Sequence, residues 1–146
     1  MDVAFIAGFG PIGTDDGASH DFWAGSLGLP FHENEPGYFH TEEIPGAKAF
    51  AIWPLSQAAE ATFGTPSWPA DRPIPQAWIE FDVHAPEEVA TAVDQLRERG
   101  LEILVEAHLE PWGQTTARLQ SPEGLLVGVS FTPWMHRVDD AADAEG

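Results

Sequence analysis

The sequence predicts an α+β fold built from two copies of a βαβββ module. Apolar and polar residues alternate along many short segments, which is typical of strands with two distinct faces. Each half of the chain also holds one helix that ends at a Gly-Leu pair, Gly28-Leu29 and Gly100-Leu101. Residue identity between the halves is low, so the repetition is structural. A helix packed on one face of a strongly twisted sheet leaves the other face as a concave wall.

The first module is expected over about residues 3–63. Its helix carries Phe22 and Trp23, and Gly28 stands where a helix of this kind ends. Turns that contain proline and glycine separate the later strands. The expected segments are a strand over 3–9, a loop over 10–17, a helix over 18–27, strands over 29–33, 38–42 and 47–53, and one or two helical turns over 54–63.

A linker over 64–76 contains four prolines and leads to the second module, expected over about 77–132. The helix over 86–99 is the clearest element, because Val89, Ala92, Val93 and Leu96 recur at helical spacing. Strands are expected over 77–83 and 101–106. A hairpin over 112–131 follows, with a tight turn at Ser121-Pro122-Glu123-Gly124 that places proline and glycine where type I turns favour them.

Length and composition limit the classes of protein. A chain of 146 residues is long enough for one domain, expected over 1–138, followed by an acidic flexible tail over 139–146. Twenty-four acidic against six basic residues give a net charge of −18, which argues against nucleic acid and anionic membranes as partners. The same charge would attract cationic small molecules.

The absence of cysteine excludes disulfides, thiolate metal sites and thiol catalysis. The sequence holds no apolar run long enough to cross a membrane. An acidic residue stands where a signal peptide needs positive charge. A cytoplasmic location is therefore expected.

Two segments carry a family resemblance. The stretch HDFWAGSLGL, residues 20–29, resembles the "aFYrdvLGL" helix of the vicinal oxygen chelate superfamily, which includes glyoxalase I, bleomycin resistance proteins and extradiol dioxygenases. The stretch WGQTTARLQSPEG, residues 112–124, resembles its "WGxRxFxxxDPDG" hairpin, with Ser121 where the family usually has Asp and Thr115 where it often has Arg. The resemblance covers about residues 3–132 by element order. It implies an eight-stranded cupped sheet with helices on the outer face.

The resemblance also locates four metal-facing positions, which catalytic members fill with His and Glu or Gln. They fall at Gly8, near Trp53, at Trp78 or Glu80, and at Gly128. Glycine has no side-chain ligand, and the indole nitrogen has no lone pair for a metal. We therefore expect no metal and no cofactor, as in the metal-free members that resemble bleomycin resistance proteins.

The six histidines do not replace this metal site. His20, His84 and His136 are expected on the surface. His32, His40 and His108 lie on or beside strands, and their roles stay open.

Alternation places an aromatic and acidic set of residues on the concave wall. Ile79, Phe81 and Val83 are expected to face the helices, so their neighbours on that strand face the cup. Simple core packing explains the tryptophans as well as a ligand wall does. Two acids on a covered strand need a partner, such as Arg118, or a cationic guest. The candidate ligand-binding residues are Trp53, Trp78, Glu80, Asp82, Trp112, Gln114, Thr116 and Arg118.

These residues favour a small-molecule binding protein that sequesters a cationic or planar aromatic compound without a metal. The alternatives are a lyase, isomerase or dioxygenase-like enzyme of the same superfamily with an atypical or absent metal site, and an interaction module without a ligand. A homodimer is expected, because relatives commonly pair their cups across a two-fold axis.

Overall fold

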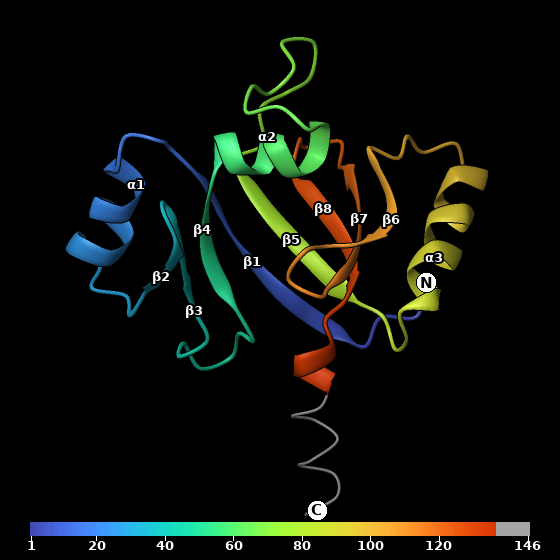
Figure 1. Ribbon diagram of the computed structural model, residues 1–146, viewed down its shortest axis with the longest axis horizontal. Helices are drawn as coiled ribbons and strands as arrows, with labels where there is room; N and C mark the ends of the chain where they lie inside the picture. The colour runs from blue at the N-terminus through green and yellow to red at the C-terminus, as the bar shows by residue number, and fades with distance from the viewer. Residues whose placement is uncertain (137–146) are drawn as a thin grey trace, which may run out of the picture.

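The computed structural model describes residues 1–136, and it shows one curved, mixed sheet of eight strands that does not close into a barrel (Figure 1). The order across the sheet is β2-β3-β4-β1-β5-β8-β7-β6. This confirms the predicted α+β cupped sheet. The strands are β1 (Phe5–Gly13), β2 (His32–Glu35), β3 (Tyr38–Thr41), β4 (Phe50–Pro54), β5 (Ala77–Asp82), β6 (Val105–Leu109), β7 (Thr115–Gln120) and β8 (Leu126–Phe131). The helices are α1 (Ala18–His20), the π-helix η1 (Asp21–Ser26), α2 (Leu55–Phe63) and α3 (Glu87–Glu98).

The two halves join through their first strands. Strand β1 pairs antiparallel with β5, with Phe9 opposite Ile79, and this pairing makes the sheet continuous. Within each half the first and last strands run parallel, β1 with β4 and β5 with β8. The concave face of the sheet is therefore lined by both halves.

Helix α3 covers the outer face of the second half, as its apolar spacing predicts. Val89, Ala92 and Val93 are buried against Val83 and Val129. Gly100 follows with a φ of 87°, a left-handed conformation that glycine adopts without strain and that ends the helix. The predicted hairpin is also present: the amide of Gly124 donates to the carbonyl of Ser121 over 2.8 Å.

The helix of the first half is shorter than expected and partly a π-helix. It packs through aromatic contacts, with His20 stacked on Phe39 at 3.9 Å and Trp23 edge-on to Phe50 at 5.7 Å between ring centroids. None of the residues of α1 and η1 is buried. This half therefore has a less enclosed outer face than the second half.

Several predicted boundaries are wrong, and the start of β4 is one of them, since this strand begins at Phe50 and not at residue 47. Strand β1 runs to Gly13, where a loop was expected, because its glycines allow β1 and β4 to approach closely: a Cβ at Gly10 would lie 1.9 Å from the carbonyl oxygen of Ala51. The last strand before the hairpin, β6, begins at Val105 and not at residue 101. Likewise β2 begins at His32 and not at residue 29.

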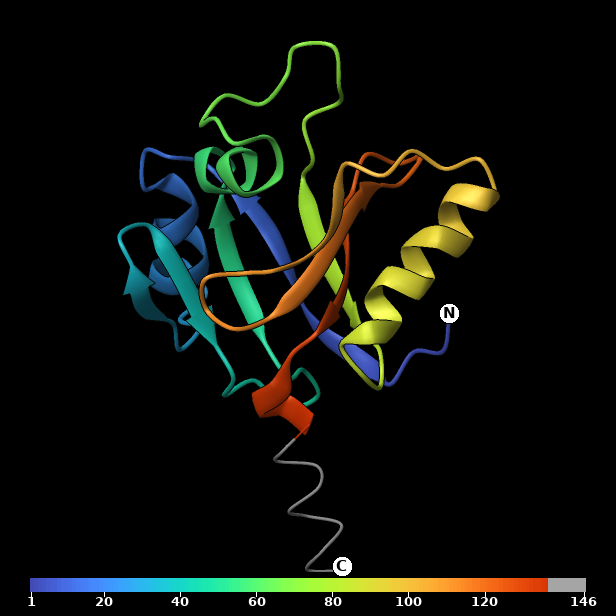
Figure 2. The same cartoon turned by 45° about the vertical axis from the view of Figure 1, so that its right-hand side comes forward.

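Helix α2 is longer than the one or two turns expected, with nine residues. It buries Ala58, Ala59 and Thr62, so tertiary packing stabilises a segment of modest helical signal. In both overall views it lies across one end of the strands (Figures 1 and 2).

Within residues 1–136, no helix is both long and apolar enough to span a membrane. The predicted acidic tail over 139–146 lies outside the described residues.

Candidate ligand cavity

The concave face of the sheet encloses a cavity of about 340 Å³. Strands β1, β4, β5 and β7 form its floor and sides, and the β2–β3 hairpin and the segment after β8 add two further walls. Six of the eight residues predicted from side-chain alternation line it. They are Trp53, Trp78, Glu80, Trp112, Gln114 and Arg118.

The tryptophan side chains of the cavity differ in how much of each is exposed and so available to contact a ligand. Trp78 is only 7% exposed, donates its Nε1–H to the carbonyl of Ala51 over 3.1 Å, and packs edge-on to Trp53 at 6.2 Å. It belongs largely to the core. Trp112 and Trp134 are 51% and 36% exposed and also line the cavity. The available stacking surface therefore lies on these two indoles.

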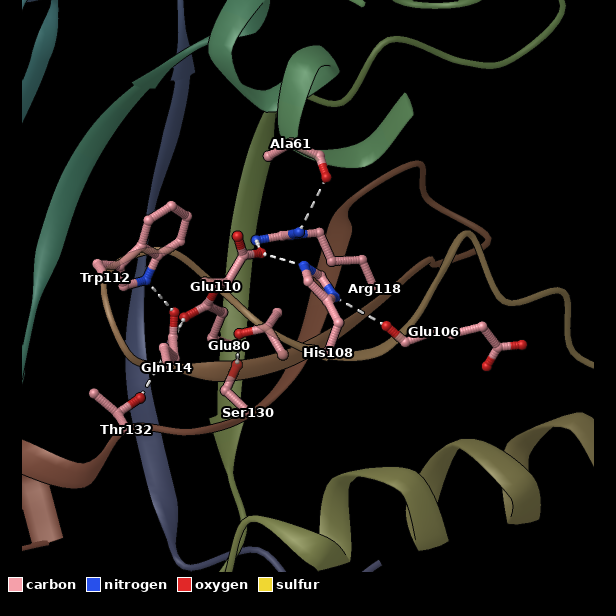
Figure 3. A network of polar contacts seen from close by, with 11 residues as sticks. Ala61, Glu80, Glu106, His108, Glu110, Trp112, Gln114, Arg118, Ser130 and Thr132 are labelled. Atoms are coloured by element: carbon pink, nitrogen blue, oxygen red, sulfur yellow. Dashed lines mark hydrogen bonds and ion pairs between the residues drawn. The ribbon is translucent and has the colours of Figure 1, made fainter. Parts of the chain in front are cut away.

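Glu80 belongs to a polar network in which Gln114 makes the most side-chain hydrogen bonds (Figure 3). One of its carboxylate oxygens accepts a hydrogen bond of 3.0 Å from the side-chain amide of Gln114. The same amide donates to Thr132 Oγ1 over 2.9 Å, and its oxygen accepts the Nε1–H of Trp112 over 2.9 Å. Burial raises the pKa of Glu80, Arg118 and Gln114 act against that rise, and Asp82 and Glu110 add to it.

Arg118 is 2% exposed and held on several sides (Figure 3). Its Nη2 lies 2.8 Å from Glu110 Oε1, and its Nη1 donates to the carbonyl of Ala61 over 3.4 Å. The guanidinium also sits over the ring of Trp53, 5.3 Å from the centroid. The same guanidinium acts electrostatically on Glu80, where it lowers the pKa against the effect of burial.

Two predicted residues, Asp82 and Thr116, do not line the cavity. Both are 0% exposed. They lie on the correct face of their strands, but both are buried. Asp82 is covered by the segment after β8, from which Thr132 and His136 donate hydrogen bonds to it. The Thr116 hydroxyl lies 3.4 Å from Oγ of its cross-strand neighbour Ser130. Alternation identified the face of the sheet without identifying what covers it.

The histidines fall into different environments. His40 lines the cavity with its Nδ1 3.0 Å from the Asn34 amide nitrogen. His32 is exposed near Glu43, and His108 lies 3.1 Å from Glu110 Oε1. The expectation that His136 is a surface residue is wrong, since its side chain is 17% exposed and bonded to Asp82.

Further cavity residues were missed by the sequence argument. Tyr38, Glu35 and Glu42 come from the β2–β3 hairpin, and Trp134 and Met135 follow β8. Burial raises the pKa of the Tyr38 hydroxyl, with Glu80 and Glu35 contributing. Alternation on β3 would have identified Tyr38, but the residues after β8 carry no strand pattern.

Three of the positions that the resemblance assigns to the metal, Gly8, Glu80 and Gly128, lie side by side in the sheet. Gly8 and Gly128 both pair with Glu80 across β1, β5 and β8, and Ala49, just before β4, lies beside Gly8. Neighbouring side chains occupy the space: a Cβ at Gly8 would lie 2.9 Å from the Trp78 ring, and one at Gly128 would lie 2.6 Å from Glu80 Cγ. Glu80 is the one carboxylate at these positions. Among residues 1–136, no group of three or more His, Cys, Asp or Glu side chains is placed to hold a metal ion.

Comparison with known proteins identifies the family. A model of the Glyoxalase/Bleomycin resistance protein/Dioxygenase superfamily matches residues 12–129. The chain belongs to this superfamily. The sequence has no match among curated proteins.

Solved structures show that other proteins share this fold. A superfamily member from Vibrio splendidus superposes with a TM-score of 0.52 at 16% identity, over 85% of this chain and 96% of that one. A Mn(II)-bound glyoxalase from Novosphingobium aromaticivorans gives 0.54 at 19% identity, over 89% of this chain and 39% of that one. A protein described as NAD-dependent benzaldehyde dehydrogenase from Legionella pneumophila gives 0.58 at 14% identity, over 85% and 96%. At these identities the similarity shows the fold alone.

Proposed function

We propose that this superfamily member binds an organic cation that carries a planar aromatic group, and that it does so without a metal. The cavity volume of about 340 Å³ suits a compound of two or three fused rings. The exposed indoles of Trp112 and Trp134 supply stacking faces, and cations gain further from contact with such faces.

The charge of the cavity is the observation that carries the proposal. Three carboxylates, Glu35, Glu42 and Glu80, line it against one guanidinium, that of Arg118. Arg118 also lies 2.8 Å from buried Glu110, so its single positive charge is shared with a fourth carboxylate. A cationic guest would relieve this excess, whereas an anionic guest would add to it.

The test compares two planar tricyclic compounds of opposite charge, the cation proflavine and the anion anthracene-9-carboxylate, by quenching of tryptophan fluorescence. Proflavine is expected to bind more tightly. Glu80→Gln removes the central negative charge at nearly constant shape and should weaken proflavine by about 1–3 kcal/mol, the scale of a hydrogen bond to a charged group. Trp112→Ala should weaken it by about 1 kcal/mol through loss of the stacking face.

Matched controls come from outside the cavity. Glu33→Gln changes the net charge equally on an exposed position of β2, and Trp23→Ala removes an indole from the outer face. Neither should alter the affinity for proflavine. Tighter binding of the anion, or unchanged affinity in both cavity variants, would overturn the proposal. Conversion of the bound compound would instead favour the alternative of an enzyme.

Metal independence is part of the same proposal, and it rests on the donor-poor positions Gly8, Ala49 and Gly128 around Glu80. Proflavine affinity should therefore be unchanged by EDTA or by added Mn²⁺, Zn²⁺ or Ni²⁺. The expected homodimer concerns a second chain and stays a prediction, which sedimentation at micromolar concentration would test.

A further inference from the structure

The segment that follows β8 forms one wall of the cavity. Strand β8 ends at Phe131, and the chain then turns, with the amide of Met135 donating to the carbonyl of Thr132 over 3.1 Å. Trp134 and Met135 from this turn line the cavity. In both overall views the turn lies at the end of the strands opposite to α2 (Figures 1 and 2).

Asp82 holds this turn against the sheet through hydrogen bonds. Its carboxylate, at the end of β5, is 0% exposed and accepts three hydrogen bonds from the turn. The donors are the Thr132 amide at 2.7 Å, the Thr132 hydroxyl at 2.9 Å and His136 Nε2 at 2.8 Å. Trp134 and Met135 lie between these two anchored residues, so their positions depend on both ends.

His136 is held by its ring as well as by its nitrogen. The imidazole stacks on Phe131 with centroids 4.3 Å apart and an interplanar angle of 27°. It also lies 4.9 Å from the ring of Phe5 on β1. Hydrogen bonding and ring packing therefore fix the end of the turn against three strands, β1, β5 and β8.

The same turn reaches the polar network of the cavity. Thr132 Oγ1 donates to Asp82 and accepts from the Gln114 amide that also bonds Glu80. Asp82 is thus linked to the centre of the cavity through two side chains, although it does not line the cavity itself.

We propose that Asp82 and His136 are positioning residues, which set ligand affinity by holding Trp134 and Met135 in the cavity wall. This role rests on the proposed function for its effect on affinity. It assigns Asp82 a purpose different from the direct charge contact that the sequence suggested. It also predicts that loss of the hydrogen bond between Asp82 and His136 weakens ligand binding by displacing Trp134.

The test is a double-mutant cycle on proflavine binding. His136→Phe keeps an aromatic ring against Phe131 and removes the nitrogen that bonds Asp82. It should raise the Kd about three- to tenfold, as expected for the loss of one hydrogen bond. In a Trp134→Ala background, the same change should alter the Kd by less than about twofold, because the wall residue it positions is already gone. Asp82→Asn, which keeps the shape of the side chain, should show the same dependence on Trp134.

The control is His84→Phe, because His84 is 52% exposed, pairs with Asp2 and lies outside the cavity. It should leave the Kd unchanged. An equal loss of affinity from His136→Phe with and without Trp134 would overturn the proposal, since a general loss of structure acts in both backgrounds.

Hydrogen exchange of the ligand-free protein separates this proposal from the proposed function. His136→Phe should speed exchange of the amides of Thr132 and Met135 while leaving those of β5 unchanged. If the parent protein does not bind proflavine, the proposed function is wrong. The exchange rates would still show whether the Asp82–His136 hydrogen bond holds the turn after β8 in place. Unchanged exchange at Thr132 and Met135 would overturn the positioning role.

Discussion

The two halves of this protein share a topology but differ in how completely they bury their apolar side chains. The second half has a closed outer core, in which α3 buries Val89 and Val93 completely or nearly so. The first half leaves apolar side chains open, with Ile6, Phe9 and Leu27 at 48%, 43% and 52% exposed. A repeated order of strands and helices therefore does not imply a repeated core.

The two halves also contribute different kinds of residue to the cavity. The ionisable and amide side chains of the polar network, Glu80, Glu110, Gln114 and Arg118, come from the second half, although Arg118 also donates to the carbonyl of Ala61 in the first half. The first half supplies the opposite walls, such as Trp53 and Tyr38. The half with the tighter core also carries the buried charges, which is physically consistent, because a buried ion pair needs a rigid surrounding to keep its geometry.

The largest expected effect comes from breaking the buried pair of the second half. Arg118→Met leaves Glu110 buried without its guanidinium partner and should lower the free energy of unfolding by about 3–5 kcal/mol. Arg72→Met is the matched control: Arg72 pairs with Glu102 at 2.6 Å, but the side chains are 28% and 66% exposed. Its cost should be much smaller, because solvent screens this exposed pair. Chemical denaturation measures both, and similar values for the two variants would contradict the contrast.

An intermediate effect should distinguish the two outer faces. Val89→Ala removes two methyl groups at a site that is 0% exposed and should cost about 2 kcal/mol of stability. Leu27→Ala removes a larger apolar volume at a site that is 52% exposed and should cost less than about 1 kcal/mol. The measurement is again denaturant unfolding. If Leu27→Ala were the more costly variant, the first half would hold a core that the exposures do not show.

The smallest effect is a pH-dependent one within the second half. Because burial raises the pKa of Glu80 above its ordinary value of 4.5, the contribution of this residue to stability is present at low pH and is lost as pH rises through its folded pKa. Glu80→Gln, which has no such loss, should therefore be more stable than the parent protein at pH 7, and the difference should fade towards pH 4. Arg118 keeps its contact with Glu110 in that variant.

The same Glu80→Gln substitution is expected to weaken proflavine binding, so stability and affinity should change in opposite directions. Unfolding curves from pH 4 to pH 8 check this, with Glu33→Gln as the exposed control. A constant difference across that range would show that the charge of Glu80 is not the cause.

The sequence by itself determined the order of elements, the face of the sheet that carries indoles and acids, and the helix and turn of the second half. These features depend on local rules: the two-residue period of a strand, the helical spacing of Val89 to Leu96, and the preference of Pro122 and Gly124 for their turn positions. For the same reason, six of the eight predicted residues line one cavity.

Only the tertiary structure decided which of those residues stay open and which are covered. Asp82 and Glu80 have the same parity on β5, yet Asp82 is covered because residues 132 and 136, about fifty positions away, bond to it. The register between β1, β5 and β8 placed Gly8 and Gly128 beside Glu80, and the turn after β8 brought Trp134 into the wall. Such contacts depend on the packing of segments that are far apart in the chain, and no local pattern in the sequence encodes them.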